Sequence, residues 1–438
     1  MTDGIIWKQL VSYAVPILLG NVLQQFYTIS DCITVGRLVG KEALAAISAT
    51  ELLVTIVIGM FVGISMGATI VIAQKYGAKD GKALHESVHT TAGLTLIIGV
   101  VVTVFGVAGT RAMLHLMSTP NDVFDHAAVY LHIYFAGIMG QVVYNMCSGI
   151  LRAVGDSKRP LIALIITSVI NIVLDLLLVA VFHMGVMGVA IATVFSQFVS
   201  AFYLCWLLFC SEEEFRLVLH DISINRDIAR GIFVIGIPIG LQRTVIALSN
   251  TFIVSKVNSF GSGALAGWGV FRKVEELGIN GMQSLSLAAS TFIGQNYGAG
   301  NKQRSKEGTK TAMVITVLFT LLITAVTVVF REQIILLFNS DPGVVRCGSL
   351  AIVVIMPFLW MNAVYQVAAG ELRGTGSGNS PMIVAVISFV IIRQIYLNLI
   401  WPVAKSLEMV FLSFPVGWFF AAVIMTADMY AARRKRLS

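Results

Sequence analysis

The sequence predicts an all-α polytopic membrane protein with twelve transmembrane helices, arranged as two pseudo-symmetric six-helix bundles around a central cleft. Hydrophobic residues make up 57% of the 438 residues and charged residues only 12%, whereas a soluble domain has about 25% charged residues. The mean hydropathy is +0.85. Apolar runs of about 20 residues, each long enough to cross a bilayer as a helix, recur along the whole chain. The third observation is an internal repeat.

The repeat has one constant offset. Gln74-Lys-Tyr-Gly-Ala78 returns as Gln295-Asn-Tyr-Gly-Ala299, a shift of 221 positions. The same shift pairs further positions: Tyr144 with Tyr365, Gly149 with Gly370, Leu151-Arg152 with Leu372-Arg373, Gly155 with Gly376 and Pro160 with Pro381. A single offset across separate blocks indicates two copies of one structural unit.

Twelve apolar segments can be placed in order. The expected helices span residues 10–36, 44–72, 92–111, 127–150, 160–183, 186–210, 231–256, 264–293, 311–331, 346–370, 381–403 and 407–431. This gives an N-lobe at 1–210, a polar cytoplasmic linker at 211–230 and a C-lobe at 231–438. A unit of six spans begins and ends on the same side of the membrane. The two lobes should therefore be related by an axis along the membrane normal, with the substrate path between them.

The two repeated blocks are expected to be turns and helix-packing sites rather than substrate contacts. Gly77 and Gly298 in the first block are predicted to stop the second and eighth helices, since glycine readily takes a positive φ. In the second block, Pro160 and Pro381 are predicted to open the following helices, where the missing N–H is harmless.

Positive charge indicates topology rather than nucleic-acid binding. The net charge is +7, and by this helix assignment 19 Lys and Arg residues fall on one side of the membrane against 7 on the other. The positive-inside rule places both termini in the cytoplasm of a multi-pass cell-membrane protein. The first apolar run is predicted to be a retained span, not a signal peptide. Five cysteines, Cys32 among them, show no metal or disulfide spacing and are interpreted as small buried side chains.

Several motifs resemble the multidrug and toxic compound extrusion (MATE) transporter family. They are Ile29-Ser-Asp31 followed by Val35-Gly-Arg37, Gln74 to Ala78, Ser148-Gly-Ile-Leu-Arg152 with Gly155-Asp156, and Gly294 to Gly300. The resemblance covers nearly the whole chain. It implies twelve helices in two bundles, a V-shaped cleft, and drug export driven by inward H⁺ or Na⁺. The DinF-like branch fits better than the NorM-like branch, because the stretch from Gly236 to Asn250 lacks the acid of the seventh helix and has Ile246 in its place.

Two acids inside predicted spans are candidates for ion coupling. A carboxylate in hydrocarbon is energetically unfavourable, so its presence there indicates a function. Asp31 lies near the end of the first helix and Asp175 within the fifth, four residues after Asn171 and thus on the same helical face. Together with Thr193 on the next helix, they resemble the N-lobe cation site of DinF-like members. Such a set suits a hard cation such as Na⁺, or a carboxyl pair that shares one proton. The sequence does not choose between the two ions.

The alternative interpretation is structural: both acids only hydrogen-bond to neighbouring helices. The repeat argues against it, because the 221 offset pairs the four residues with groups that cannot bind a cation in the same way: Phe252, Ile392, Tyr396 and Phe414. We therefore expect coupling in the N-lobe alone.

The second half carries its own charges within expected spans. Glu275 resembles an acid often found in this part of the family's eighth helix, and it either neutralises Arg272, three residues earlier, or contacts a cationic substrate. Arg243 and Arg393 either pair within the protein, extend toward the interface, or favour anionic substrates.

Substrate contacts are predicted from polar and aromatic residues that would line the cleft: Gln24, Tyr27, Gln141, Tyr144 and Asn145, with Arg272 and Glu275. Gln25 and Tyr134 extend this polar lining. Met139, Met282, Phe292, Trp268 and Trp360 offer a soft apolar surface for varied compounds. The competing interpretation for the methionines and large aromatics is core packing or lipid contact.

The sequence shows no nucleophile elbow, Walker loop or metal-ligand cluster, so neither an enzyme nor a resident cofactor is expected. The predicted function is a monomeric, cation-coupled antiporter that exports amphiphilic, cationic organic compounds by alternating access. Two rivals stay open: a flippase for lipid-linked sugars, which would need a cationic cleft that Arg243, Arg272 and Arg393 could supply, and a non-transporting receptor or scaffold.

Overall fold

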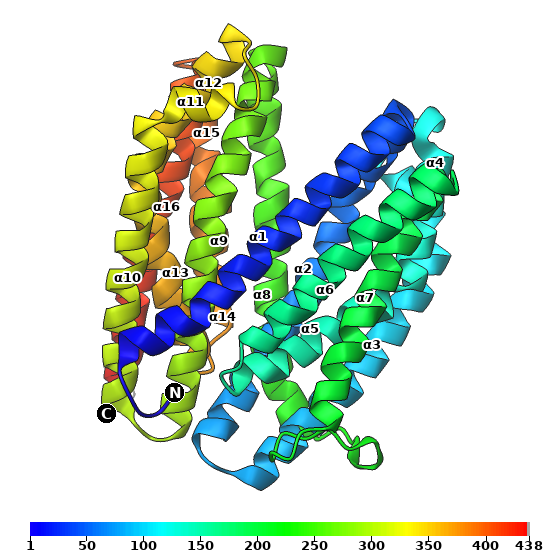
Figure 1. The fold of residues 1–438 in the computed structure, drawn as a ribbon. Coiled ribbons are helices and arrows are strands. Elements are labelled where there is room, and N and C mark those ends of the chain that lie inside the picture. Colours follow the sequence, from blue (N-terminus) through cyan, green and yellow to red (C-terminus); the bar gives the residue numbers. More distant parts are fainter. Residues whose placement is uncertain (436–438) are drawn as a thin grey trace. The chain divides into compact units, whose positions relative to one another are not determined.

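The protein is all-helical in a computed structural model that describes residues 1–435. Within this range the side chains of Cys32, Arg37, Lys41, Glu42, Leu44, Ser48 and Leu52 are not described. The interpretation of Cys32 as a small buried side chain therefore lies outside the described part. Figure 1 shows the helices coloured from the N-terminus in blue to the C-terminus in red.

Six spans come from the first half of the chain. Their helices are α1 (Ile6–Leu38), α2 (Lys41–Gly77), α3 (Gly81–Leu116), α4 (Asn121–Ala136) with α5 (Ile138–Ala153), α6 (Lys158–Asp175) continued by the π-helical turn η1 (Leu176–Val181), and α7 (Gly185–Phe209). The linker that follows contains only a short 3₁₀ turn, η2 (Leu219–Asp221).

Six more spans follow the linker. They are α8 (Arg226–Asn258), α9 (Ser262–Gly298), α10 (Lys302–Val329) with the short α11 (Arg331–Leu336), α12 (Pro342–Ile355) joined through η3 (Met356–Phe358) to α13 (Leu359–Gly374), α14 (Asn379–Val386) joined through the π-helical turn η4 (Ile387–Ile392) to α15 (Arg393–Ile400), and α16 (Leu407–Lys435).

The number of spans confirms the twelve-helix prediction. In the described part of the chain, ten helices are long and apolar enough to cross a membrane, and the α4–α5 pair, bent by 48° at Gly137, makes an eleventh. Helix α9 is the twelfth. It has 37 residues, but four charged side chains within its first half lower its hydropathy: Arg272, Lys273, Glu275 and Glu276.

Several helices begin or end well outside the predicted ranges. Helix α3 begins at Gly81 rather than at residue 92, because the Asp80 side chain accepts a hydrogen bond from the Ala83 N–H at 3.0 Å and caps the helix. Helix α8 likewise begins at Arg226, inside the expected linker. Hydropathy marks where a helix is apolar, whereas capping decides where it begins.

The chain divides into two compact units. The N-terminal unit comprises Val15–Gly236, and the C-terminal unit comprises Met1–Ala14 with Ile237–Ser438. The first turns of α1 group with the second half because Tyr13 is buried there, with its Oη 3.2 Å from Thr291 Oγ1. The start of α8 groups with the first half because Gly67 and Gly236 allow close backbone packing between α2 and α8.

The two units repeat the same helix contacts, which confirms the 221 offset at atomic level. Ser65 Oγ donates to the Asn145 carbonyl at 2.7 Å, and Ser286 Oγ donates to the Gln366 carbonyl at 2.6 Å. One turn further, Thr69 bonds to the carbonyl of Gly149 at 3.1 Å. The matching bond joins Ser290 to the carbonyl of Gly370 at 3.0 Å. The second repeated block therefore packs helices together, as expected.

Gly77 and Gly298 are the last residues of α2 and α9, so both helices end at the predicted glycines. The positive φ lies two residues later, because the alanines at the C-caps keep helical φ values. The left-handed residues are Lys79, with φ of 54°, and its repeat partner Gly300, with φ of 74°. The strained position thus recurs in both units, but only the second copy uses glycine for it.

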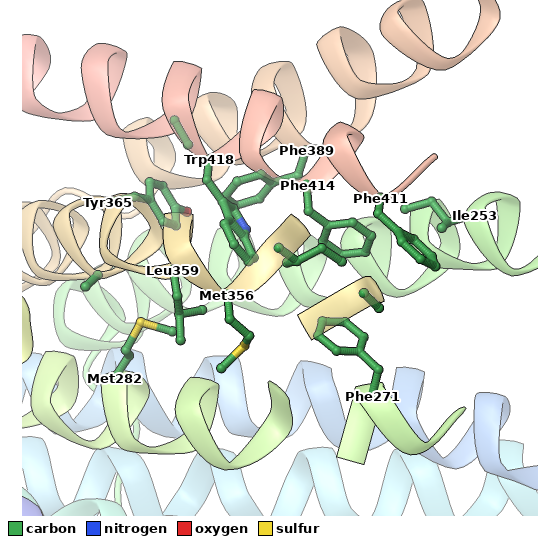
Figure 2. Packing of buried hydrophobic residues seen from close by; sticks show 14 of the residues in the cluster. Ile253, Phe271, Met282, Met356, Leu359, Tyr365, Phe389, Phe411, Phe414 and Trp418 are labelled. Carbon is green, nitrogen blue, oxygen red and sulfur yellow. The ribbon is translucent and has the colours of Figure 1, made fainter. Parts of the chain in front are cut away.

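Most of the apolar side chains predicted for substrate contact belong to the protein core. Figure 2 shows the core of the C-terminal unit, where Met282 lies near Leu359 below a row of aromatic residues. Trp268 is buried against Phe411, with ring centroids 5.3 Å apart, and Phe292 is fully buried. The packing interpretation holds for Met282, Trp268 and Phe292, since side chains at 0–4% exposure offer no surface to a ligand.

Candidate cation site

The candidate site is built on α1, α6 and α7 of the N-terminal unit. Helix α6 packs against α7, and α1 approaches α6 at Gly20, where an added Cβ would lie 2.8 Å from Leu164. Near the other end of α1, Val35 packs in a small apolar cluster with Val179 of η1 and two valines of α7, Val186 and Val189. These contacts fix the stretch of α1 that carries Asp31.

Asp175 lies at a specific irregularity of the helix. It is the last residue of α6, and the π-helical turn η1 begins directly after it. Single π-helical turns are frequent at functional sites, because they interrupt the regular hydrogen-bond ladder and re-aim nearby side chains. Asn171 lies one turn earlier on the same face, and both side chains are buried.

Each of the four predicted ligands has at least one buried polar atom without a hydrogen-bond partner. Within residues 1–435, sixteen buried side-chain nitrogen and oxygen atoms have no partner, and six of them belong to this set. They are Asp31 Oδ1, both carboxylate oxygens of Asp175, both amide atoms of Asn171 and Thr193 Oγ1. Buried polar groups are nearly always hydrogen-bonded, so these partnerless atoms make the four residues candidates for binding a proton or an ion.

The two carboxyl groups face each other. Asp31 and Asp175 lie within hydrogen-bonding reach of one another, although they belong to helices far apart in the sequence. Two carboxylates offer only acceptors, so neither can satisfy the other unless a proton or a cation lies between them. The structure thus brings together the acids that the sequence analysis singled out. The oxygen-rich donor set fits either a proton or a hard cation such as Na⁺.

The second unit holds a permanent cation at the matching position. Buried residues of α6 and α14 correspond with an offset of 221 up to Ser168 and Phe389, but after the extra residue of the π-turn η4 the buried positions shift by one. Asn171 therefore corresponds to Arg393 rather than to Ile392, and Asp175 to Leu397 rather than to Tyr396. The earlier pairing was wrong by one residue at both positions, because a π-turn inserts one residue into a helix.

Arg393 is held by hydrogen bonds from one of its terminal nitrogens, whereas its buried Nε has no partner. Its Nη2 donates to Ser249 Oγ at 2.7 Å and to Asn250 Oδ1 at 3.0 Å, and its guanidinium lies 5.2 Å from the ring centroid of Phe414. Arg272 forms an ion pair with the buried Glu275. Arg243 donates a long hydrogen bond of 3.4 Å to Gln283. Internal pairing is thus confirmed for Arg393 and for the Arg272–Glu275 pair.

The predicted substrate contacts of the N-terminal unit fall into two groups. Tyr27 lies near both Asp31 and Tyr144, and Gln24 donates to its hydroxyl at 3.3 Å, so these residues border the cation site. Gln141 is buried, and Asn145 donates its amide to the Gln141 carbonyl at 2.8 Å within α5. The Asn145 amide is therefore engaged in its own helix.

One cluster of possible metal ligands was not predicted from the sequence. His85, His89 and Asp221 bring three possible metal ligands together where the linker meets α3, although no metal-ligand cluster was expected. The signal was present, since His85-Glu-Ser-Val-His89 has the spacing that places two histidines on one helical face.

Two repeats of six membrane-crossing helices define a polytopic protein with the repeat architecture that many membrane transporters share. The family described as MatE matches residues 16–177 and 238–399, one segment in each half, and the chain belongs to this family. Its relatives are transporters rather than enzymes. The DinF-like assignment stays a prediction.

Curated relatives match along most of their length. The chain is 32% identical over 405 residues to the probable multidrug resistance protein YpnP of Bacillus subtilis (strain 168), covering 90% of this chain and 88% of that protein. It is 28% identical to the probable multidrug resistance protein NorM of Thermotoga maritima, covering 87% and 82%. A solved outward-facing conformation of a multidrug resistance MATE family transporter of the MOP superfamily is 24% identical, with a TM-score of 0.92 over 98% of this chain and 97% of that one, and shows the same fold.

Proposed function

We propose that this protein is a cation-coupled antiporter that exports amphiphilic, cationic organic compounds across the cell membrane by alternating access. The relatives named as multidrug resistance proteins support the export of varied compounds. The observation that carries the ion coupling is the set of six partnerless buried atoms on Asp31, Asn171, Asp175 and Thr193.

The proposed coupling follows from electrostatics. With no ion bound, two carboxylates in a desolvated site repel each other, and a proton or Na⁺ removes that repulsion. The bound ion therefore favours the arrangement in which α1 lies against α6, and its release favours another packing of α1. An ion that binds one conformation better than the other shifts the population between them, which is what alternating access needs.

The proposed substrate is an amphiphile that competes with the ion. Gln24, Tyr27 and Tyr144 lie beside the acidic pair and combine aromatic surface with polar atoms, a combination suited to flat organic cations. A lipid-linked sugar is disfavoured as substrate, since two of the three arginines that could form a cationic cleft, Arg272 and Arg393, are paired within their own unit. We also propose that the protein acts as a monomer with both termini in the cytoplasm.

Transport in proteoliposomes tests this proposal. Purified protein is reconstituted, and efflux of a fluorescent organic cation is followed under an imposed pH gradient and then under an imposed Na⁺ gradient, each with the membrane potential clamped. We expect one of the two gradients to drive accumulation against the substrate's own gradient. Equal movement with and without either gradient would contradict ion coupling, while leaving facilitated transport possible.

A further inference from the structure

We propose that His85, His89 and Asp221 form a binding site for a divalent transition metal such as Zn²⁺, which fastens the linker between the two halves of the chain to helix α3. This site is separate from the candidate cation site, and its ligands are of a different chemical class. All three residues belong to the N-terminal unit.

The three side chains converge from two elements. His85 and His89 lie one turn apart on α3, with ring centroids 3.9 Å apart. Asp221 ends the 3₁₀ turn η2 of the linker, and its Oδ2 lies 3.1 Å from His85 Nε2. One possible ligand atom from each residue lies within 4.8 Å of the others. Two histidines at this helical spacing are a common way to hold Zn²⁺ from one side.

The hydrogen bonds of His89 already select the tautomer that a metal needs. The backbone N–H of Val218 can only donate, and it lies 3.0 Å from His89 Nε2, so Nε2 carries the lone pair. The proton is therefore on Nδ1, which donates to the His85 carbonyl at 2.7 Å. A histidine ligand typically donates its other N–H to a carbonyl in this way, which fixes the orientation of the ring. Metal binding would exchange the Val218 hydrogen bond for a coordinate bond.

The surroundings of the cluster do not favour a peptidase-like role for the metal. Glu86, which would be the general base in a His-Glu-x-x-His peptidase, accepts a hydrogen bond from Asn225 Nδ2 at 3.1 Å. Thr90 Oγ1 accepts the Asn225 N–H at 3.1 Å, so the linker is tied to α3 on the far side of the cluster as well. Two imidazoles and one carboxylate suit Zn²⁺ better than Na⁺ or Mg²⁺, which prefer oxygen ligands, and water completes a four-coordinate site.

The expected effect of the metal is to hold the linker in place. Phe215 and Leu217 are already buried against the N-terminal unit, so the metal would add a second attachment after them in the sequence. Because the ligands meet only in the folded chain, Zn²⁺ should raise the thermal stability of this protein.

Zn²⁺ titration of the full-length protein in detergent tests the proposal, after removal of any histidine tag and of bound metal by a chelator. His85→Asn and Asp221→Asn are the test variants, since these side chains are 38% and 43% exposed and tolerate substitution. His220→Asn, which changes an exposed linker histidine next to Asp221, is the matched control. His89 is buried, and a variant there risks misfolding.

We expect wild type and His220→Asn to bind one Zn²⁺ per chain and to melt at a higher temperature when Zn²⁺ is present. Each test variant should bind Zn²⁺ at least about tenfold more weakly and lose the shift in melting temperature. Equal Zn²⁺ affinity in wild type and both test variants would overturn the proposal, as would a wild-type protein that binds no Zn²⁺. Neither outcome depends on transport, so the test is independent of the proposed function.

Discussion

Arg393 occupies, in the C-terminal unit, the buried helix position that Asn171 occupies in the N-terminal unit. Around Arg393 the polar atoms of Ser249 and Asn250 are paired with the guanidinium. Around Asn171, both of its amide atoms, both carboxylate oxygens of Asp175 and Oδ1 of Asp31 have no hydrogen-bond partner. One copy of the repeat thus contains a permanent positive charge, and we propose that the other binds an exchangeable one.

Arg393→Met should lower stability without removing ion dependence. The change deletes charge-assisted hydrogen bonds to the buried Ser249 and the half-buried Asn250 and should reduce the free energy of unfolding by about 2 kcal/mol. Thermal melting in detergent measures this loss, and proteoliposome transport measures the ion dependence. Arg243→Met, which removes a single long hydrogen bond, is the control. Loss of ion dependence in Arg393→Met with unchanged stability would contradict our assignment of its role.

Gly149→Ala should destabilise the N-terminal unit. An added Cβ would lie 2.7 Å from Ser65 Oγ and 2.9 Å from Thr69 Oγ1, so α2 and α5 would have to move apart. Such overpacking lowers stability by about 1 to 3 kcal/mol. Gly269→Ala, in an exposed part of α9 with no atom within 4 Å of the new Cβ, should be neutral or slightly stabilising. Equal melting temperatures for the two variants would show that the glycine contact is unimportant.

Phe215→Ala and Leu217→Ala should release the linker from the N-terminal unit. Both side chains are 7% exposed and pack in a cluster with α2, α3, α5 and α7. Removing either should cost about 2 to 4 kcal/mol locally and speed proteolytic cleavage within residues 211–225. Leu219→Ala is the matched control, since that side chain is 70% exposed. The same cleavage rate in all three variants would mean that the linker is not held by these contacts.

Asp175→Asn should uncouple transport from the ion gradient. The substitution removes one of the two facing carboxylates, so the charge that attracts a proton or Na⁺ is halved. Substrate should still move down its own gradient, but accumulation against it should fall at least about tenfold. Asp122→Asn, an exposed acid in the first turn of α4, is the control. Full accumulation by Asp175→Asn would exclude this carboxylate from coupling.

Much of this architecture was predictable because it follows from the spacing of residue types along the sequence. The 221 offset places Ser65 and Ser286 at matching positions, and their hydrogen bonds match. The free-energy cost of a carboxylate within a membrane span was enough to single out Asp31 and Asp175. The offset also paired Gly155 with Gly376, and both have a positive φ, of 101° and 95°.

Other features could not be found by spacing alone. The π-turns η1 and η4 lie at different places in the two copies, and the surrounding apolar residues give no signal for an inserted residue. The hydrogen bonds of Arg393 depend on Ser249 and Asn250, about 140 residues earlier in the chain. Whether Met282 and Trp268 lie in the core or line a binding surface depends on tertiary packing. The sequence cannot separate the two, because the same residue types occur in both places.

Ion release on substrate binding tests the central claim most directly. Purified protein in weakly buffered detergent solution is mixed with a transported organic cation while protons are followed with a pH indicator and Na⁺ with a selective electrode. Wild type should release one of the two ions, and Asp31→Asn and Asp175→Asn should release neither while Asp122→Asn behaves as wild type. Undiminished ion release from Asp31→Asn and Asp175→Asn would contradict the assignment of coupling to this acidic pair.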